Sequence, residues 1–261
     1  MEIEPLRTLL SSASPKSKSS LFREQSNQYR ALYWLYYDST NYDSYSDEEK
    51  IQLWSLGVFY YDTLGHQWYN NSNWLSDTNV TVCDWYGLTC GTNDNNGNGE
   101  DAEGISTEGK VISIDLQTNR VRRDIPYEIT LLTSLQYLGL SYNSLGKLEE
   151  WLFSMPSLEV IDLDGNGIQY IPNNIPKKNR VKELYLAENE IWEIPSSIGR
   201  LRNLEVLWLW NNDLEGTLPD YLSSLRNLGK FCFNLVVTSV LISSSFQLTL
   251  CFFSTTSSSR A

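Results

Sequence analysis

A pattern of apolar residues and asparagine occurs five times between residues 111 and 214, and it constrains the fold more than any other feature. Each copy fits L-x-x-L-x-L-x-x-N-x-L, and the copies begin at Val111, Leu135, Leu158, Val181 and Leu204. The asparagines of the pattern are Asn119, Asn143, Asn166, Asn189 and Asn212, so the period is 24 residues once and 23 residues three times. A regular period of this length predicts a solenoid, in which each unit buries its apolar face against its neighbours.

The second half of each repeat is also periodic. An apolar residue followed by proline occurs at Ile125-Pro126, Ile171-Pro172, Ile194-Pro195 and Leu218-Pro219, and Leu148 takes this place in the second repeat. The third repeat differs, because Lys178 stands where the other repeats have an apolar residue. We therefore expect the outer side of the third repeat to be irregular and less well packed.

The segment LEGTLPDYLSSLRNL, residues 214–228, resembles the plant-type leucine-rich repeat L-x-G-x-[IL]-P-x-x-[IL]. The resemblance covers about half of the chain. It implies an α/β leucine-rich repeat solenoid with a curved, parallel concave sheet. It also implies that the repeated asparagines are structural and form a ladder of side-chain hydrogen bonds to the backbone where each strand ends.

Side chains alternate along a strand, so the x positions of the pattern face solvent on the concave side. Trp208 and Trp210 occupy two of these positions, although tryptophan is usually buried. The positions in neighbouring repeats predict a concave binding face of aromatic and acidic side chains. Its expected members are Tyr137, Tyr142, Asp162, Asp164, Glu183, Tyr185, Glu188, Trp208 and Trp210.

The residues before the repeats predict a helical module. Ser46 and Glu49 form an S-x-x-E capping box, followed by apolar residues at helical spacing, which predicts a helix over residues 47–62. An earlier helix is expected over residues 26–38. Its stripe of tyrosine and tryptophan suits either a sugar-binding platform or core packing, and core packing is the more frequent case.

The segment WYNNSNWLSDTNVTVCDWYGLTC, residues 68–90, is similar to the N-terminal cap of plant-type leucine-rich repeat proteins. The resemblance implies a Cys83–Cys90 disulfide that stiffens the cap, together with Trp85 and Gly87 of the motif. The longer helical segment in front of it resembles the caps of leucine-rich repeat proteins that are abundant in diatoms. Asn70 and Asn79 begin N-x-S/T sequons, which favour an extracellular setting.

A loop rich in glycine, asparagine and acidic residues spans residues 91–109. Asp94, Asn96, Asn98 and Gly99 match the start of a calcium-binding loop, but Ile105 stands where such a loop needs an acidic ligand. We therefore expect a solvated insertion without a metal site.

The two ends do not follow the repeat pattern. Residues 1–24 lack the apolar core of a signal peptide and are expected to be disordered or mispredicted. A sixth repeat begins at Leu228 but loses the pattern at Val236, and Cys232 and Cys251 have no evident partner. The uncharged run 235–253 is a degenerate cap, a weak membrane anchor or a gene-model error, of which we favour the last. The expected divisions are 1–24, the cap 25–104, the repeats 105–233 and the tail 234–261.

Charge and composition limit the function. The chain of 261 residues has a net charge of −12, which disfavours nucleic acid as a partner. Its one histidine, His66, lies in the cap, and the sequence contains no nucleophilic triad, phosphate loop or metal cluster. We therefore expect no enzyme activity and no cofactor.

The sequence predicts a binding module for a protein or peptide, with aromatic side chains as contacts and acids that select a basic partner. The resemblance implies a receptor-type ectodomain or a secreted recognition protein, extracellular or attached to a membrane through a missing or C-terminal segment. An intracellular, cytoplasmic scaffold and an inhibitor of cell-wall hydrolases are the alternatives.

Overall fold

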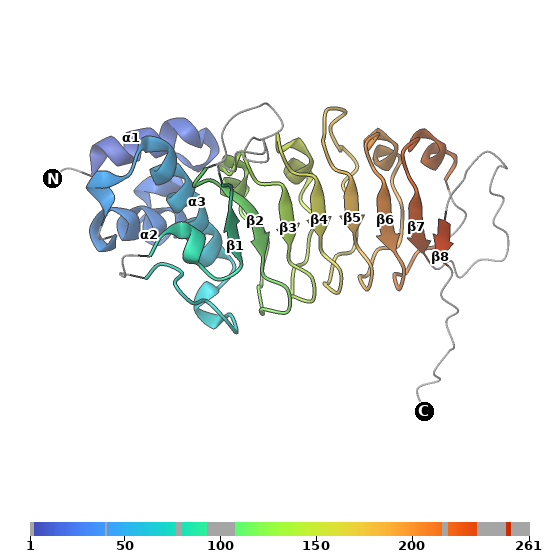
Figure 1. Ribbon diagram of the computed structural model, residues 1–261, viewed down its shortest axis with the longest axis horizontal. Coiled ribbons are helices and arrows are strands. Elements are labelled where there is room, and N and C mark those ends of the chain that lie inside the picture. Colours follow the sequence, from blue (N-terminus) through green and yellow to red (C-terminus); the bar gives the residue numbers. More distant parts are fainter. Residues whose placement is uncertain are drawn as a thin grey trace.

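A computed structural model describes residues 3–39, 41–76, 80–92, 108–215 and 219–233, and the backbone of residues 249–251. Figure 1 shows a helical module followed by a row of stacked strands. The helical module contains α1 (Glu4–Ala13), η1 (Pro15–Ser17), η2 (Ser20–Phe22), α2 (Asn27–Tyr33), η3 (Trp34–Asp38), η4 (Tyr42–Ser44), α3 (Asp47–Asp62) and η5 (Gly65–Gln67). The segment η6 (Val82–Asp84) then leads to the first strand.

Helix α3 forms the centre of the helical cap. Its N-terminus has the expected capping box, in which the Ser46 hydroxyl accepts from the Glu49 N–H and the Glu49 carboxylate accepts from the Ser46 N–H. Trp54 and Phe59 are fully buried, so the helix lies inside the cap rather than on its surface. The Trp54 indole N–H donates to the Gln28 carbonyl at 3.0 Å, which ties α3 to α2.

Residues 1–24 were expected to be disordered or mispredicted, and the structure shows that the described residues 3–24 are folded rather than disordered. Residues 3–23 form α1, η1 and η2, and Leu6, Leu10 and Leu21 are buried in the core. The buried Glu128 carboxylate of the first repeat accepts from the Ser17 hydroxyl at 2.5 Å. This N-terminal segment is therefore joined to the repeats by both apolar packing and a buried hydrogen bond.

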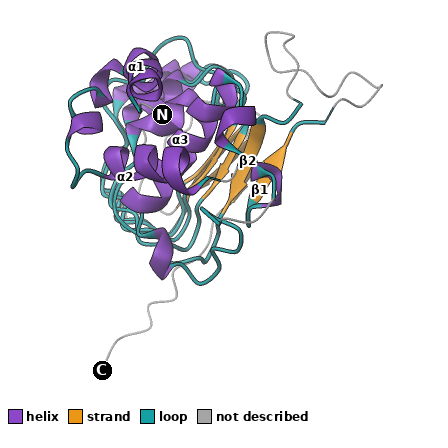
Figure 2. Cartoon of the chain, turned by 90° about the vertical axis from the view of Figure 1, so that its left-hand side faces the viewer, coloured by secondary structure: helices purple, strands orange, loops and turns teal. Residues whose placement is uncertain are grey.

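The repeats form one sheet whose strands follow the order of the chain. The strands are β1 (Leu88–Cys90), β2 (Val111–Asp115), β3 (Tyr137–Gly139), β4 (Val160–Asp162), β5 (Glu183–Tyr185), β6 (Val206–Leu209), β7 (Lys230–Phe233) and β8 (Thr249–Cys251). Strand β1 is antiparallel to β2, and each later pair of neighbours is parallel. The end-on view in Figure 2 shows the sheet on one side of the solenoid.

Short 3-10 helices form the side of the solenoid opposite the sheet. They are η7 (Tyr127–Leu131), η8 (Glu150–Ser154), η9 (Ser196–Arg200) and η10 (Asp220–Ser224), in the first, second, fourth and fifth repeats. The third repeat has no such helix among its described residues, which confirms that it is irregular. It still contributes to the core, because Ile171 and Ile175 are buried, although Asn173, Asn174, Lys177 and Lys178 are exposed.

The asparagines of the pattern form the ladder that the resemblance implied. The Asn166 amide donates to the carbonyls of Leu140 and Leu163, and its oxygen accepts from the Leu145 N–H at 3.0 Å. Asn143, Asn189 and Asn212 repeat this arrangement one turn apart. Asn119 makes two hydrogen bonds to the backbone of Asn70, so the first rung joins the repeats to the cap.

Cys83 and Cys90 form a disulfide with their Cα atoms 5.4 Å apart. The bond connects η6 to β1 beside Trp85, which is buried. Cys232, for which the sequence indicated no partner, is also disulfide-bonded. Strand β8 pairs with β7, so the described backbone of the tail continues the sheet. Among the described helices, none has the length and apolar character needed to span a membrane.

Candidate functional site

A hollow of ≈ 440 Å³ lies on the open face of the sheet, over strands β3 to β6. Its lining consists of Tyr137, Val160, Asp162, Asp164, Glu183, Tyr185 and Trp208. The register of the strands places these residues side by side. Tyr137 is opposite Val160 on the next strand, Asp162 is opposite Tyr185, and Tyr185 is opposite Trp208. We call this site the concave hollow.

Aromatic rings form one wall of the concave hollow. The rings of Tyr185 and Trp208 meet edge to face, with centroids 4.7 Å apart and planes at 89°. Leu184 and Leu207 beneath them are fully buried, so the strand alternation places the two rings outside as expected. Trp208 is half-buried, and its indole N–H has no hydrogen-bond acceptor among the described residues.

A glycine makes room for the aromatic side chain at the other end of the hollow. A Cβ atom at Gly139 would lie 2.6 Å from the Tyr137 ring. The ring therefore lies across its own strand, and a larger residue at position 139 would displace it. Burial, followed by the nearby Asp115 and Asp162 carboxylates, raises the pKa of Tyr137 to about 12. The hydroxyl thus stays neutral and remains available as a hydrogen-bond donor at physiological pH.

Asp164 is a buried carboxyl group at the edge of the hollow. One of its oxygens accepts from the Ala187 N–H at 2.6 Å, which ties the ends of two neighbouring strands together. Burial, assisted by the nearby Asp162 and Glu188 carboxylates, raises the pKa of Asp164 to about 7 despite the lowering effect of the Ala187 hydrogen bond. Burial also raises the pKa of Asp162. The charge of the hollow therefore changes near neutral pH.

The hydroxyl groups of the tyrosines bond to acidic side chains. The Tyr185 hydroxyl donates to the Glu183 carboxylate at 2.5 Å, and the Tyr142 hydroxyl donates to Glu188 at 2.8 Å. In the described part of the chain, no Lys or Arg forms an ion pair with Asp162, Asp164 or Glu183. The hollow thus combines carboxylates that lack a cation with aromatic rings, an arrangement that attracts a positively charged group.

The structure divides the expected binding residues into two groups. Tyr137, Asp162, Asp164, Glu183, Tyr185 and Trp208 line the hollow, as does Val160, which the sequence did not single out. Tyr142, Glu188 and Trp210 follow strands β3, β5 and β6 and lie outside that lining. The omission of Val160 has a simple reason: an apolar residue at a solvent-facing position carries no charge or ring to mark it.

The structure contains a second asparagine ladder that was not predicted from the sequence. The Asn203 amide donates to the Asn179 carbonyl, and the Asn227 amide donates to the Arg202 carbonyl, both at 3.0 Å. These residues precede the strands, whereas the expected ladder follows them. The signal was present in the sequence, because Asn179, Asn203 and Asn227 recur every 24 residues.

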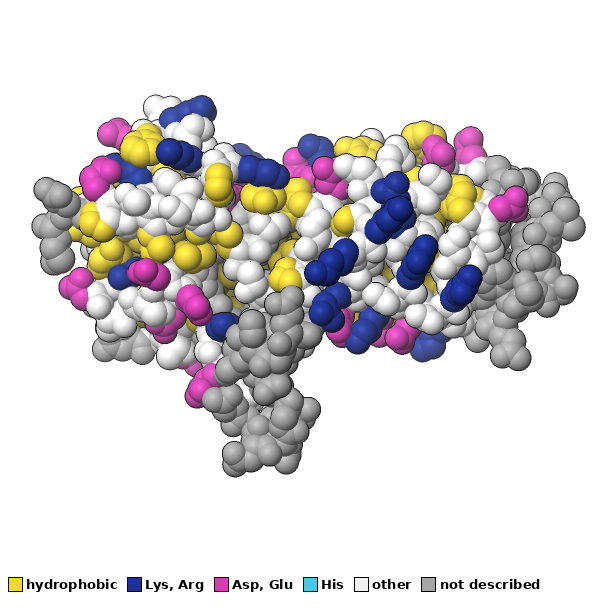
Figure 3. Space-filling view, turned by 90° about the horizontal axis from the view of Figure 1, so that it is seen from above, with side chains coloured by type: hydrophobic (Ala, Val, Ile, Leu, Met, Phe, Trp, Pro, Cys, Tyr) yellow, Lys and Arg dark blue, Asp and Glu magenta, His cyan; other side chains and the backbone are white. Residues whose placement is uncertain are grey.

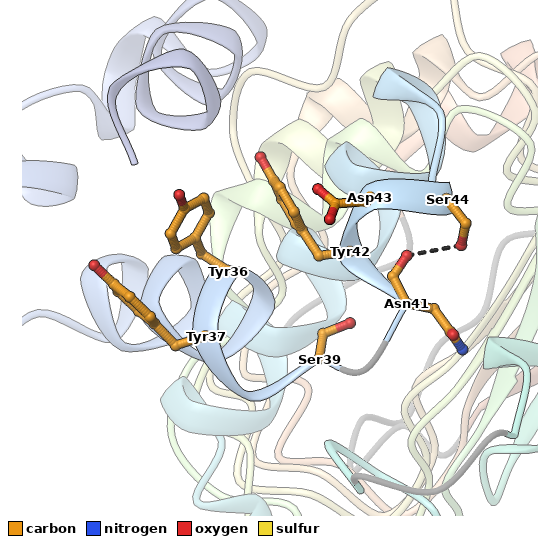
Figure 4. A pocket seen from close by; sticks show the side chains of 7 residues that line it. All are labelled: Tyr36, Tyr37, Ser39, Asn41, Tyr42, Asp43 and Ser44. Carbon is orange, nitrogen blue, oxygen red and sulfur yellow. Dashed lines mark hydrogen bonds between the residues drawn. The ribbon is translucent and has the colours of Figure 1, made fainter. Parts of the chain in front are cut away.

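Another hollow, of ≈ 450 Å³, lies on the cap (Figure 4). Tyr36 and Tyr37 from η3 and Tyr42 from η4 line it, together with Ser39, Asn41, Asp43 and Ser44. The prediction of core packing holds for Trp34 and Leu35, which are buried, but Tyr37 is 56% exposed. This hollow lies outside the repeats and is separate from the concave hollow.

Two features that the sequence singled out, the sequons and the loop that partly matches a calcium-binding loop, fall partly or wholly outside the described residues. Asn70 is described, and its side chain accepts from the Ser72 N–H and hydroxyl, whereas Asn79 is not. The calcium-like residues Asp94, Asn96, Asn98 and Gly99 are also outside the described range. Among the described residues, no group of three or more histidine, cysteine or acidic side chains could hold a metal ion.

Stacked parallel strands, an asparagine ladder and a disulfide-containing cap define a repeat solenoid whose sheet has one open face. The fold of the chain is that of a leucine-rich repeat solenoid, and it is similar to plant-type leucine-rich repeat ectodomains. Two family models described as leucine-rich repeats match residues 110–168 and 203–225.

The relatives of this chain include plant receptors. It is 42% identical over 102 residues to the calmodulin-binding receptor kinase CaMRLK of Arabidopsis thaliana, covering 37% of this chain and 15% of the relative. It is 32% identical over 116 residues to receptor-like protein 7 of the same plant, covering 44% and 12%. The chain therefore spans less than one sixth of the length of these two relatives.

Solved structures show the same architecture. The ectodomain of the receptor kinase SOBIR1 from Arabidopsis thaliana is 25% identical, with a TM-score of 0.52 over 70% of this chain and 90% of that one. The BIR2 ectodomain from the same plant is 26% identical, with a TM-score of 0.50 over 62% and 82%. The PEPR1–AtPEP1 complex contains a chain that is 26% identical, with a TM-score of 0.51 over 67% and 25%.

Proposed function

We propose that this chain is a non-enzymatic recognition domain that binds a protein or peptide in the concave hollow. The observation that carries the proposal is the joint presence of the Tyr185–Trp208 ring pair and carboxylates without cations in one hollow. Aromatic side chains in a partly desolvated centre supply most of the binding energy of many interfaces. The similarity to plant receptor ectodomains supports a receptor-type role.

The ligand we propose carries a lysine, an arginine or a free amino terminus at its centre. A cation placed against Asp162 would lie among the carboxylates and aromatic rings that line the hollow. Placing it there would offset the cost of burying these acids without a counter-charge. Specificity for basic ligands follows, because an acidic ligand would add to the repulsion among Asp162, Asp164 and Glu183.

A selection from a library of random peptides tests the site. We expect enriched peptides to contain basic residues and to lose at least about tenfold in affinity on Trp208→Ala, the size of a hot-spot loss. Trp192→Ala is the matched control, because Trp192 is a 55% exposed tryptophan outside the hollow. Equal binding by both variants would place the recognition surface elsewhere on the chain.

We also propose that the domain works outside the cell, either secreted or held at a membrane by another part of the protein. The Cys83–Cys90 disulfide supports this, since disulfides persist in oxidising compartments. Peptide mapping of the native protein without reductant tests it. The bond, together with a glycan on Asn70 or Asn79, is the expected result. Two free thiols and unmodified sequons would favour the cytoplasmic scaffold instead.

A further inference from the structure

The edge of the solenoid where the strands begin carries a concentration of positive charge. The three turns that precede β5, β6 and β7 contain six bases besides Lys182, which is paired with Glu159: Lys177, Lys178, Arg180, Arg200, Arg202 and Arg226. We call this group the basic edge. Seen from above, the dark blue side chains gather over this part of the repeats (Figure 3).

The basic edge is mostly free of acidic partners, although the whole chain has 32 acids and 20 bases. Lys177, Lys178, Arg200, Arg202 and Arg226 are exposed, and the described residues place no carboxylate at ion-pair distance from them. Two acids, Glu159 and Glu205, directly precede strands β4 and β6 at the same edge. Glu159 is paired with Lys182 at 2.8 Å. Positive charge therefore dominates this edge of an acidic protein.

The backbone beneath these bases is held rigidly by the second asparagine ladder. Asn179 donates to the Arg200 carbonyl at 3.1 Å, Asn203 to the Asn179 carbonyl, and Asn227 to the Arg202 carbonyl. The Arg200 guanidinium donates to the Ile175 carbonyl at 2.8 Å, which adds a further link between turns. A backbone that is already ordered loses little conformational entropy when its side chains bind a ligand.

The repeat sets the spacing of the charges. Arg202 and Arg226 occupy the same position in successive turns, and each N–H makes the same hydrogen bond, to the carbonyl two residues before it. Neighbouring strands lie about 4.8 Å apart, so bases follow the solenoid axis at short, regular steps. A linear polymer with an anionic group on each unit matches such a row.

We propose that the basic edge binds a linear polysaccharide whose sugar units carry carboxylate or sulfate groups. Arginine favours both anions, because its planar guanidinium donates two parallel hydrogen bonds to such a group. A protein partner fits less well, since protein interfaces are centred on apolar residues. None of the large hydrophobic side chains found exposed in the described chain lies in residues 177–182, 200–205 or 224–230.

The test compares two variants of equal charge change. The first is Lys177→Gln/Lys178→Gln/Arg202→Gln/Arg226→Gln, which keeps Arg200 because its side chain bonds to the backbone. The control is Lys18→Gln/Arg23→Gln/Arg120→Gln/Lys147→Gln, whose four bases are exposed elsewhere. Circular dichroism and thermal melting of both variants would establish that each one is folded.

Dextran sulfate and alginate are the charged probes, and neutral dextran is the uncharged one. We expect the first variant to bind the charged probes at least about tenfold more weakly than the wild type at about 50 mM salt, with a shallower salt dependence. The control variant should stay within about threefold of the wild type. Equal losses in both variants would overturn the proposal. So would phosphatidylserine vesicles or polyglutamate binding to the edge when the charged polysaccharides do not.

Discussion

Tyr185 and Trp208 meet edge to face across neighbouring strands, with ring centroids 4.7 Å apart and planes at 89°. The two side chains come from the same position of successive repeats. Such a pair adds about 0.5–1.5 kcal/mol beyond its buried area, so it is a preformed wall rather than two mobile side chains. The concave hollow is therefore largely formed before any ligand binds.

The first prediction separates the fold from binding at adjacent residues. Leu207→Ala should lower the free energy of unfolding by about 2–5 kcal/mol, because Leu207 is fully buried. Trp208→Ala should cost only about 0.5–1.5 kcal/mol, since Trp208 is half-buried and loses mainly its contact with Tyr185. Urea unfolding of both variants measures the difference. Equal, large losses would show that Trp208 belongs to the core.

The second prediction concerns Asp164 and stability. Its pKa is raised from 3.8 to about 7 in the folded protein, so the folded state binds the extra proton between these two values. The contribution of Asp164 to the free energy of unfolding is therefore fully present below about pH 4 and is lost as the pH rises through about 7. Asp164→Asn should be more stable than the wild type at about pH 8, by on the order of 2 kcal/mol, and similar to it at about pH 4.

Asn is a suitable replacement because its side-chain oxygen can still accept from the Ala187 N–H. Unfolding curves of the two proteins at a series of pH values provide the measurement. Asp43→Asn serves as the control, since Asp43 is exposed on the cap. A stability difference between Asp164→Asn and the wild type that does not vary with pH would contradict the raised pKa.

The third prediction is the pH dependence of ligand binding. If a basic ligand binds the ionised form of Asp164, its affinity should rise as the pH increases through about 7. In Asp164→Asn this rise should be absent, because the titrating group has been removed. Titration calorimetry with a basic peptide from the library would measure it. An identical pH profile in wild type and variant would assign the effect to another group.

The fourth prediction tests the asparagine ladder. The Asn189 side chain accepts from the Ile168 N–H and donates to the carbonyls of Leu163 and Ala187. Asn189→Ala leaves the buried Ile168 N–H without its acceptor, whereas the Leu163 and Ala187 carbonyls keep the Asn166 amide and the Gly165 N–H as donors. This change should lower the free energy of unfolding by on the order of 2 kcal/mol. Asn174→Ala, at an exposed asparagine of the third repeat, should cost less than about 0.5 kcal/mol. Chemical denaturation of both variants measures these losses. Equal, small losses would mean that the asparagines of the pattern are solvated and do not stabilise the fold.

The fifth prediction tests the disulfide of the cap. Cys83→Ser/Cys90→Ser opens a loop that spans seven residues in sequence, which should lower the free energy of unfolding by about 2–3 kcal/mol. Reductant should also lower the free energy of unfolding of the wild type. It should have no effect through this site in the double variant. Unchanged stability of the double variant would mean that the apolar contacts of Trp85 hold the cap alone.

The sequence by itself determined the solenoid, its strand register and the orientation of Trp208. The reason is that alternation within a strand and the repeat period are local properties, and five copies of one pattern leave a single consistent register. The capping box of α3 followed in the same way from Ser46 and Glu49. Resemblance to a known cap pointed to the pairing of Cys83 with Cys90.

Only the tertiary structure decided which outward residues form the concave hollow. Tyr137 reaches it because its ring lies across Gly139, whereas Trp210 follows its strand and lies outside the lining. The raised pKa of Asp164 likewise depends on burial by neighbouring strands. The hydrogen bond from Ser17 to Glu128 joins residues that are 111 positions apart, and no local sequence pattern predicted it. Side-chain conformation, burial and distant contacts arise from packing between units, and the pattern of one repeat does not contain them.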